Sequence, residues 1–233
     1  NSKADEYLVV WHEIPDQSTG YDIYARRVGW GGDLRGIPFL VSRDSHAGNE
    51  GSARVVYNAA TDNYFVVWQA YTSGLWRVWG QRVSAVGGLL GSGFTVSAST
   101  GWAGLPKLAV NTTANEYLVV WRDTRSTRLD VYGQRVSGTG ALIGSNLPLA
   151  TGAGDKPGYA VAWSAAANSY LLVWDDARTG NNIAGQHLDA AGAFVGADFP
   201  IASTTVSEIT PAVAYDAKHQ GFLVTWQQWG DAT

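Results

Sequence analysis

Short apolar runs recur along the chain at a nearly constant distance. Each run is a five-residue phrase that begins with Tyr or Phe and ends with Trp, and the five copies are Tyr7–Trp11, Tyr64–Trp68, Tyr117–Trp121, Tyr170–Trp174 and Phe222–Trp226. Successive Trp residues in these phrases are 57, 53, 53 and 52 positions apart. A continuous apolar run of this length predicts a strand that is buried on both faces. The steady spacing predicts a repeat architecture.

Three further segments accompany each apolar phrase. A short segment such as Lys107–Val110 precedes it, an alternating segment such as Val131–Val136 follows it, and a closing segment such as Phe94–Ser97 ends the unit. These segments are rich in Val, Tyr and Trp, and turn residues such as Ser137–Gly140 separate them. Each unit is therefore predicted to hold four short strands.

The length of the unit defines the fold class. A unit of about 50 residues with four antiparallel strands is the period of a β-propeller blade. We predict an all-β chain in which residues 1–233 form a single β-propeller domain of four-stranded antiparallel blades, with about five repeats and incomplete first and last blades. The predicted units are approximately 1–52, 53–104, 105–156, 157–209 and 210–233. Two β-sandwiches are the alternative, but a sandwich does not require a phrase repeated five times.

The two ends of the chain break the phase of the repeat. The first unit begins just before Tyr7 and lacks an inner strand, and the last unit ends just after Trp226 and lacks its outer two strands. A largely apolar end strand left as a bare edge invites pairing. We therefore expect either a piece of a longer propeller with more than five blades or a protomer that self-associates through its terminal strands.

Composition and charge exclude several classes of protein. The chain is 45% hydrophobic and 12% aromatic, which is enough for a sizeable core. Its formal net charge of -4 offers no basic surface for nucleic acid. It has no Cys, so it can form neither disulfides nor thiolate metal sites, and no apolar run is long enough to span a membrane.

The best-preserved repeat resembles a known kind of protein. Val119–Arg125 reads Val-Val-Trp-Arg-Asp-Thr-Arg, and Asp130–Val136 reads Asp-Val-Tyr-Gly-Gln-Arg-Val. This pair of phrases resembles a repeat of large secreted bacterial β-propeller proteins. The resemblance implies an extracellular or cell-surface location and a role as an adhesive or ligand-binding module. The chain is also similar in length to small five-bladed propeller lectins, a likeness that rests on the fold alone.

The acidic position two residues after the repeated Trp is kept unevenly. Asp123 and Asp176 occupy it in two units, Glu13 replaces them in another, and Ala70 and Gln228 lose the acid. A binding site repeated in every blade would not vary so freely. We interpret the acid as half of an Asp–Arg pair, with Arg125 or Arg178, that locks a turn.

Catalytic chemistry finds little support in the sequence. Glycoside hydrolysis needs two carboxylates about 5–10 Å apart, and the five Glu residues show no convergent spacing: Glu6, Glu13, Glu50, Glu116 and Glu208. No two of the four His residues have metal-ligand spacing on one element: His12, His46, His187 and His219. No Gly-x-Ser-x-Gly nucleophile motif is present. We therefore predict that the chain is not an enzyme.

A metal cofactor is not expected, and calcium is the alternative. Two acidic turns, Asp175–Asn182 and Asp16–Asp22, offer oxygen ligands. Neither matches the twelve-residue calcium loop with its central Gly and terminal Glu.

Tryptophan provides the site candidates. Seven of the 11 Trp residues stand at repeated strand positions and are predicted to be core. The other four lie in predicted loops or turns: Trp30, Trp76, Trp102 and Trp229. Exposed indole rings stack on the apolar faces of sugars, so these four are the predicted ligand-binding residues. The alternative is that each ring packs locally.

These observations favour a non-catalytic, secreted binding or adhesion module, and the predicted ligand is a glycan or a protein surface. The first alternative is a structural subunit that assembles by strand exchange with neighbouring copies. The second is a glycoside hydrolase.

Overall fold

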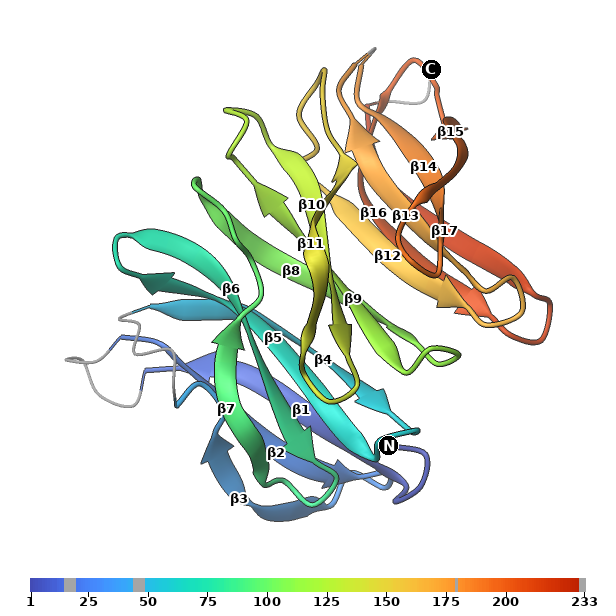
Figure 1. Cartoon of the computed structure of the whole chain (residues 1–233). Coiled ribbons are helices and arrows are strands. Elements are labelled where there is room, and N and C mark those ends of the chain that lie inside the picture. The colour runs from blue at the N-terminus through green and yellow to red at the C-terminus, as the bar shows by residue number, and fades with distance from the viewer. Residues whose placement is uncertain (15–19, 44–48, 179, 231–233) are drawn as a thin grey trace.

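The fold is built from strands alone in the part of the chain that the structure describes. A computed structural model describes residues 1–14, 20–43, 49–178 and 180–230, and it contains 17 strands and no helix over these ranges (Figure 1). The strands of the first two sheets are β1 Glu6–Glu13, β2 Asp22–Gly29, β3 Leu34–Leu40, β4 Glu50–Asn58, β5 Asn63–Thr72, β6 Leu75–Ser84 and β7 Leu89–Thr95. The remaining strands are β8 Ala103–Asn111, β9 Glu116–Asp123, β10 Asp130–Ser137, β11 Leu142–Ala150, β12 Tyr159–Ser164, β13 Ser169–Asp176, β14 Asn182–Asp189, β15 Phe194–Ala202, β16 Ser207–Asp216 and β17 Gly221–Trp229.

The strands form five antiparallel sheets that follow one another in chain order. Three sheets have four strands, β4–β7, β8–β11 and β12–β15, while β1–β3 has three strands and β16–β17 has two. Strand β4 packs beside β8, β8 beside β12, and β12 beside β16, so these four are the inner strands of successive blades (Figure 1). The predicted all-β propeller of four-stranded antiparallel blades is confirmed.

The repeated Trp strands form the core because a sheet covers each of their faces. In β5 and β9 the residues from the Tyr to the Trp are all buried, and Trp68 and Trp121 are at most 1% exposed. The sheets at the two ends have a neighbour on one face only (Figure 1). Trp226 is consequently 40% exposed and Trp11 is half-buried, so the prediction that all five repeated Trp residues are core is wrong for the first and the last.

Two of the inner strands, β8 and β16, bulge near their beginnings in the same way. The register shifts between Gly104 and Lys107 in β8 and between Ile209 and Ala212 in β16, and Leu105 and Thr210 within these bulges have φ of 54° and 57°. A side chain from the preceding blade holds each bulge. Gln69 Oε1 accepts the Leu105 N–H at 2.9 Å, and Asp175 Oδ1 accepts the Thr210 N–H at 2.8 Å. Both acceptors directly follow a repeated Trp.

The Asp–Arg pairs expected from the sequence form in two blades. Asp123 accepts hydrogen bonds from the Arg125 guanidinium at 3.0 and 2.7 Å and from the Trp121 indole N–H at 2.8 Å. Asp176 Oδ1 accepts a hydrogen bond from Arg178 Nε at 2.9 Å. In each pair the acid closes the turn after the Trp strand, so these carboxylates serve the fold.

The blades that lack this acid carry a carboxylate on the facing strand. Glu50 stands opposite Ala70, and Glu208 stands opposite Gln228. In the third blade the arrangement is reversed, because Asp123 stands opposite Ala103. The acid is therefore kept in space although it is lost from the repeated sequence position.

Glu50 makes the stability of the chain depend on pH. Burial raises the pKa of Glu50 from 4.5 to about 8, and the nearby Asp22 charge adds to the effect. The folded chain thus holds this proton more tightly than the unfolded chain, so the stabilisation is complete below pH 4.5 and is lost as the pH rises towards 8. We expect the free energy of unfolding to fall by a few kcal/mol, about one for each unit of pKa shift, across this interval. Urea unfolding at a series of pH values measures it.

Glu50→Gln should remove most of this dependence, whereas Glu13→Gln, at an exposed position, should leave it in place. An unchanged slope in Glu50→Gln would contradict the assignment.

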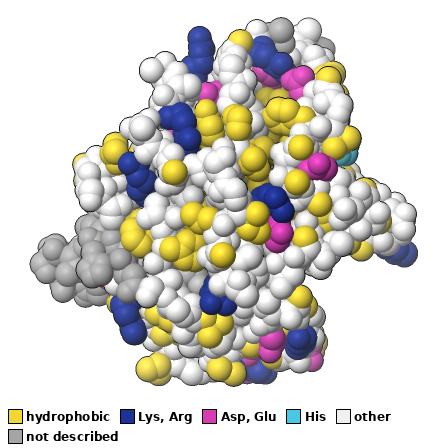
Figure 2. Space-filling model, in the orientation of Figure 1, with side chains coloured by type: hydrophobic (Ala, Val, Ile, Leu, Met, Phe, Trp, Pro, Cys, Tyr) yellow, Lys and Arg dark blue, Asp and Glu magenta, His cyan; other side chains and the backbone are white. Residues whose placement is uncertain are grey.

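Within the described ranges no helix is long and apolar enough to cross a bilayer. On the face shown in Figure 2, Lys and Arg side chains are scattered, and several of them lie beside Asp or Glu.

Candidate functional site

A pocket opens at the beginnings of the four inner strands. Its volume is about 370 Å³, within the range of small-molecule sites. The lining comes from β4, β8, β12 and β16, from the segment just before β12 and from the end of β13: Ser52, Arg54, Leu105, Lys107, Pro157, Gly158, Tyr159, Asp175, Ile209, Thr210 and Pro211. We call it the central pocket, because the inner strands of four blades meet there.

Two cations enter the central pocket from neighbouring blades at the same strand position. Arg54 pairs with the residue before Trp68, and Lys107 pairs with the residue before Trp121. The equivalent residues in β12 and β16 are Ala160 and Ala212. Burial, and after it the charge of Arg54, lower the pKa of Lys107. The positive charge is therefore concentrated on the β4–β8 side of the pocket.

Asp175 is a buried carboxyl group on the wall of the same pocket. It is 4% exposed, and its Oδ1 accepts the Thr210 N–H. Gly158 leaves room for it, because a Cβ there would lie 2.6 Å from Oδ2. Burial raises the pKa of Asp175 above its ordinary 3.8, although the backbone hydrogen bonds of Thr210 and Gly158 oppose the rise. A carboxyl group that keeps its proton to higher pH is suited to proton donation.

Tyr159 lines the pocket but uses its hydroxyl group for packing. The hydroxyl accepts the Arg122 N–H at 2.9 Å and donates to the Leu105 carbonyl at 2.5 Å. Burial raises the pKa of this phenol. Tyr159 thus ties β12 to β8 and β9, and its oxygen is not available as a nucleophile.

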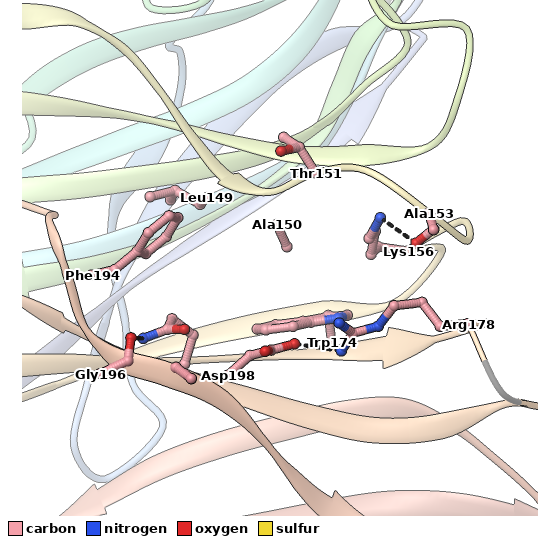
Figure 3. A pocket seen from close by; sticks show the side chains of 12 residues that line it. Leu149, Ala150, Thr151, Ala153, Lys156, Trp174, Arg178, Phe194, Gly196 and Asp198 are labelled. Atoms are coloured by element: carbon pink, nitrogen blue, oxygen red, sulfur yellow. Dashed lines mark hydrogen bonds and ion pairs between the residues drawn. The ribbon is translucent and has the colours of Figure 1, made fainter.

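A second cavity, the side pocket, lies where the third and fourth blades meet (Figure 3). Its volume is about 340 Å³, and Leu149, Lys156, Trp174, Arg178, Phe194 and Asp198 are among its lining residues. The Lys156 ammonium donates to the carbonyls of Gly152, Ala153 and Gly154 at 3.1, 3.1 and 2.7 Å and lies 3.4 Å from Asp130.

The charges of the side pocket neutralise one another. Arg178 pairs with Asp198 (Figure 3) and with Asp176, and Lys156 pairs with Asp130. In the central pocket, by contrast, neither Arg54 nor Lys107 forms an ion pair with a described residue. The central pocket is therefore the candidate functional site.

The four predicted ligand-binding Trp residues do not gather in one site. Trp30 is 77% exposed in the turn between β2 and β3, and Trp229 is 68% exposed at the end of β17. Trp76 packs on Tyr71 with ring centroids 5.6 Å apart, and the Arg122 guanidinium covers the Trp102 ring at 5.1 Å. None of the four lines the central pocket. Their part in ligand binding stays a prediction.

The acidic turns proposed for calcium have other partners. Asp175 and Asp176 receive hydrogen bonds from Thr210 and Arg178, whereas Asp16 and also His46 lie outside the described residues. Over the described ranges no three His, Asp or Glu side chains gather as metal ligands.

Sequence reasoning missed the central pocket because its residues are departures from the repeat. Arg54 and Lys107 stand where two other blades have Ala, and they belong to segments that were interpreted only as strands. Asp175 follows a repeated Trp and was interpreted as part of an acidic turn. The available signal was a charged residue at an inner-strand position that is small in other blades.

Comparison with known proteins gives a fold likeness. No protein-family model matches the chain, and no curated protein matches it by sequence. An endo-arabinase from Bacteroides thetaiotaomicron has a similar structure with a TM-score of 0.61 and 12% identity, covering 97% of this chain and 86% of that one. A GH43 β-1,3-galactosidase matches with a TM-score of 0.58 and 10% identity over 97% and 83% of the two chains. The catalytic domain of a Coprinopsis cinerea GH62 α-L-arabinofuranosidase matches with a TM-score of 0.54 and 11% identity, covering 98% of this chain and 82% of that one.

These likenesses correct two expectations. These three structures, which share the fold over nearly the whole chain, are glycoside hydrolases. They overturn the prediction of a non-catalytic binding module and the prediction that the chain is not an enzyme, and both predictions are wrong. The spacing of the Glu residues gives no sign of a carboxyl group in the central pocket, whereas the fold brings Asp175 to its wall.

Proposed function

We propose that the chain is a glycoside hydrolase that binds a glycan in the central pocket, with Asp175 as the proton donor. The observation that carries the proposal is a buried carboxyl group, with a pKa above its ordinary value, on the wall of a pocket of about 370 Å³. The fold likeness to enzymes that act on arabinose- and galactose-containing glycans supports the class of substrate.

The chemistry follows from the protonation state of Asp175. In its protonated form it gives its proton to the glycosidic oxygen as the bond from that oxygen to the anomeric carbon breaks. Positive charge develops on the sugar ring, and water then adds at the anomeric carbon while a base takes the proton that this water loses. Asp175 is the one carboxylate among the described residues that line the pocket, so we assign the proton donor and leave the base that activates water unassigned.

Asp175→Asn tests the proposal. Asparagine keeps the side-chain carbonyl that accepts the Thr210 N–H, as Gln69 does for Leu105, but it has no acidic proton to give. We expect the variant to fold and to lose hydrolysis by about 10²–10⁴-fold, the usual contribution of a positioned acid. Release of reducing ends from arabinan, galactan and related glycans measures the rate.

The pH profile adds a second readout. Because the donor must be protonated, the wild-type rate should fall on the alkaline side as Asp175 ionises, above its ordinary pKa of 3.8. The matched control is Asp198→Asn, which removes a carboxylate from the side pocket and should leave the rate unchanged. An active Asp175→Asn protein, or a wild-type chain that cleaves none of the glycans, would show that the proposal is wrong.

Two expectations from the sequence stay predictions: an extracellular location and self-association through the terminal strands. Exposed apolar residues at both ends, Tyr7 at 59% and Leu223 at 65%, support the second. Light scattering of the purified chain tests it.

A further inference from the structure

The central pocket holds positive charge that the described part of the chain does not neutralise. Arg54 on β4 donates to the Ala53 carbonyl at 2.9 Å and has no described carboxylate partner. Arg27, Arg125 and Arg135 differ from it, because they pair with Glu6, Asp123 and Glu116. A cation that lines a pocket without a partner is available to a ligand.

Lys107 brings a second charge into the same space. It is half-buried, and it lies beside Arg54 because β4 and β8 pack side by side. Burial and the charge of Arg54 make its protonated form less favourable, as its lowered pKa records. An anion placed between the two cations would remove that repulsion.

Asp175 does not serve as that anion. Its Oδ1 is taken by the Thr210 N–H, and its raised pKa means that it holds its proton more readily than an ordinary Asp. The charged residues of the lining are thus two cations and at most one anion, a net charge of at least +1.

We propose that the sugar bound in the central pocket is acidic, a uronic acid whose carboxylate lies between Arg54 and Lys107. The inference deepens the proposed function and rests on it for the cleavage step alone. Arg can hold a carboxylate through two parallel hydrogen bonds, and Lys adds a point charge. A sulfate ester on the sugar would present the same oxyanion chemistry.

The test compares two ligands that differ in charge and are otherwise identical except for the ester methyl group. Oligogalacturonides and their methyl esters are titrated calorimetrically into Asp175→Asn protein, which is expected to bind without cleaving. We expect the ester to bind at least about tenfold more weakly than the acid, in line with the strength of hydrogen bonds to charged groups. Sulfated galactan oligosaccharides form a parallel arm that distinguishes sulfate from carboxylate.

The variants Arg54→Gln and Lys107→Gln should each weaken binding of the acid by about tenfold or more, with little effect on the ester. Lys218→Gln is the matched control, because it removes an equal charge from the exposed turn between β16 and β17. Thermal unfolding of all variants checks that the fold is kept. Affinity for the acid should also fall as salt is added.

The outcomes separate the two proposals. Equal binding of acid and ester, or acid binding that survives in both cation variants, would overturn the acidic-sugar inference even if neutral glycans are cleaved through Asp175. Charge-dependent binding without cleavage would keep the inference and overturn the hydrolase. Cleavage that yields an unsaturated sugar would support the acidic substrate and replace hydrolysis by elimination.

Discussion

Trp121→Ala is expected to lower the free energy of unfolding by about 3–5 kcal/mol, as other large aromatic truncations do in cores. The side chain is 0% exposed on β9, which is buried along the whole apolar phrase. Its indole N–H also donates to Asp123 Oδ2 at 2.8 Å, so the substitution removes a donor from a buried carboxylate as well as leaving a cavity. Urea unfolding followed by tryptophan fluorescence measures the loss.

The control for this substitution is Trp30→Ala, at a ring that is 77% exposed. Its cost should stay within about 0.5 kcal/mol, as for ordinary surface sites. Should Trp121→Ala cost less than about 1 kcal/mol, β9 would not be a central strand.

Lys156→Met is expected to have a comparable effect, about 3–5 kcal/mol, because it breaks a buried ion pair and leaves one partner in place. The ammonium group is held by three consecutive carbonyls and by Asp130, and the residue is 2% exposed. Met has a similar shape, so the substitution removes the charge while filling most of the space. Chemical unfolding of the single variants Lys156→Met and Asp130→Asn gives the two costs.

The double variant Lys156→Met/Asp130→Asn separates the contribution of the ion pair to stability from that of the carbonyls around the ammonium group. Asp130→Asn removes the charge that Lys156→Met leaves unpaired, so the two substitutions together should cost less than the sum of the single costs. Strict additivity would show that the ammonium acts through the carbonyls alone. The same substitution at the exposed Lys218 should have almost no effect.

The architecture could be predicted because it is repeated. Five copies of the apolar phrase locate the Trp strands, and the flanking segments supply the other strands of each blade. The environment of Trp11 and Trp226 could not be predicted, because burial depends on whether a sheet packs on both faces, and equivalent positions in the sequence differ in that respect. The bulges at Leu105 and Thr210 could not be predicted either, because neither Leu nor Thr is a residue type that indicates a left-handed backbone conformation.

The candidate site was missed for a related reason. A repeat reveals what the blades share, whereas Arg54, Lys107 and Asp175 are where they differ. The three residues lie on β4, β8 and β13, far apart in the sequence, and only the meeting of the inner strands brings them together. The four Trp residues predicted to lie in loops were the visible exceptions to the repeat. That prediction is wrong for Trp76 on β6 and Trp229 on β17, and the fold distributes the four over separate blades.

The carboxylate that changes strand between blades has a consequence for how the chain responds to acid and alkali. In the third blade, burial would raise the pKa of Asp123, but hydrogen bonds from Arg125 and Trp121 hold it below its ordinary 3.8. That contribution to stability is present above pH 3.8 and is lost as the pH falls further. In the second blade the same place is filled by Glu50, which has the opposite shift. Neighbouring blades should therefore loosen in opposite directions of pH, with local opening favoured in the second blade as the pH rises from 4.5 towards 8 and in the third as the pH falls below 3.8.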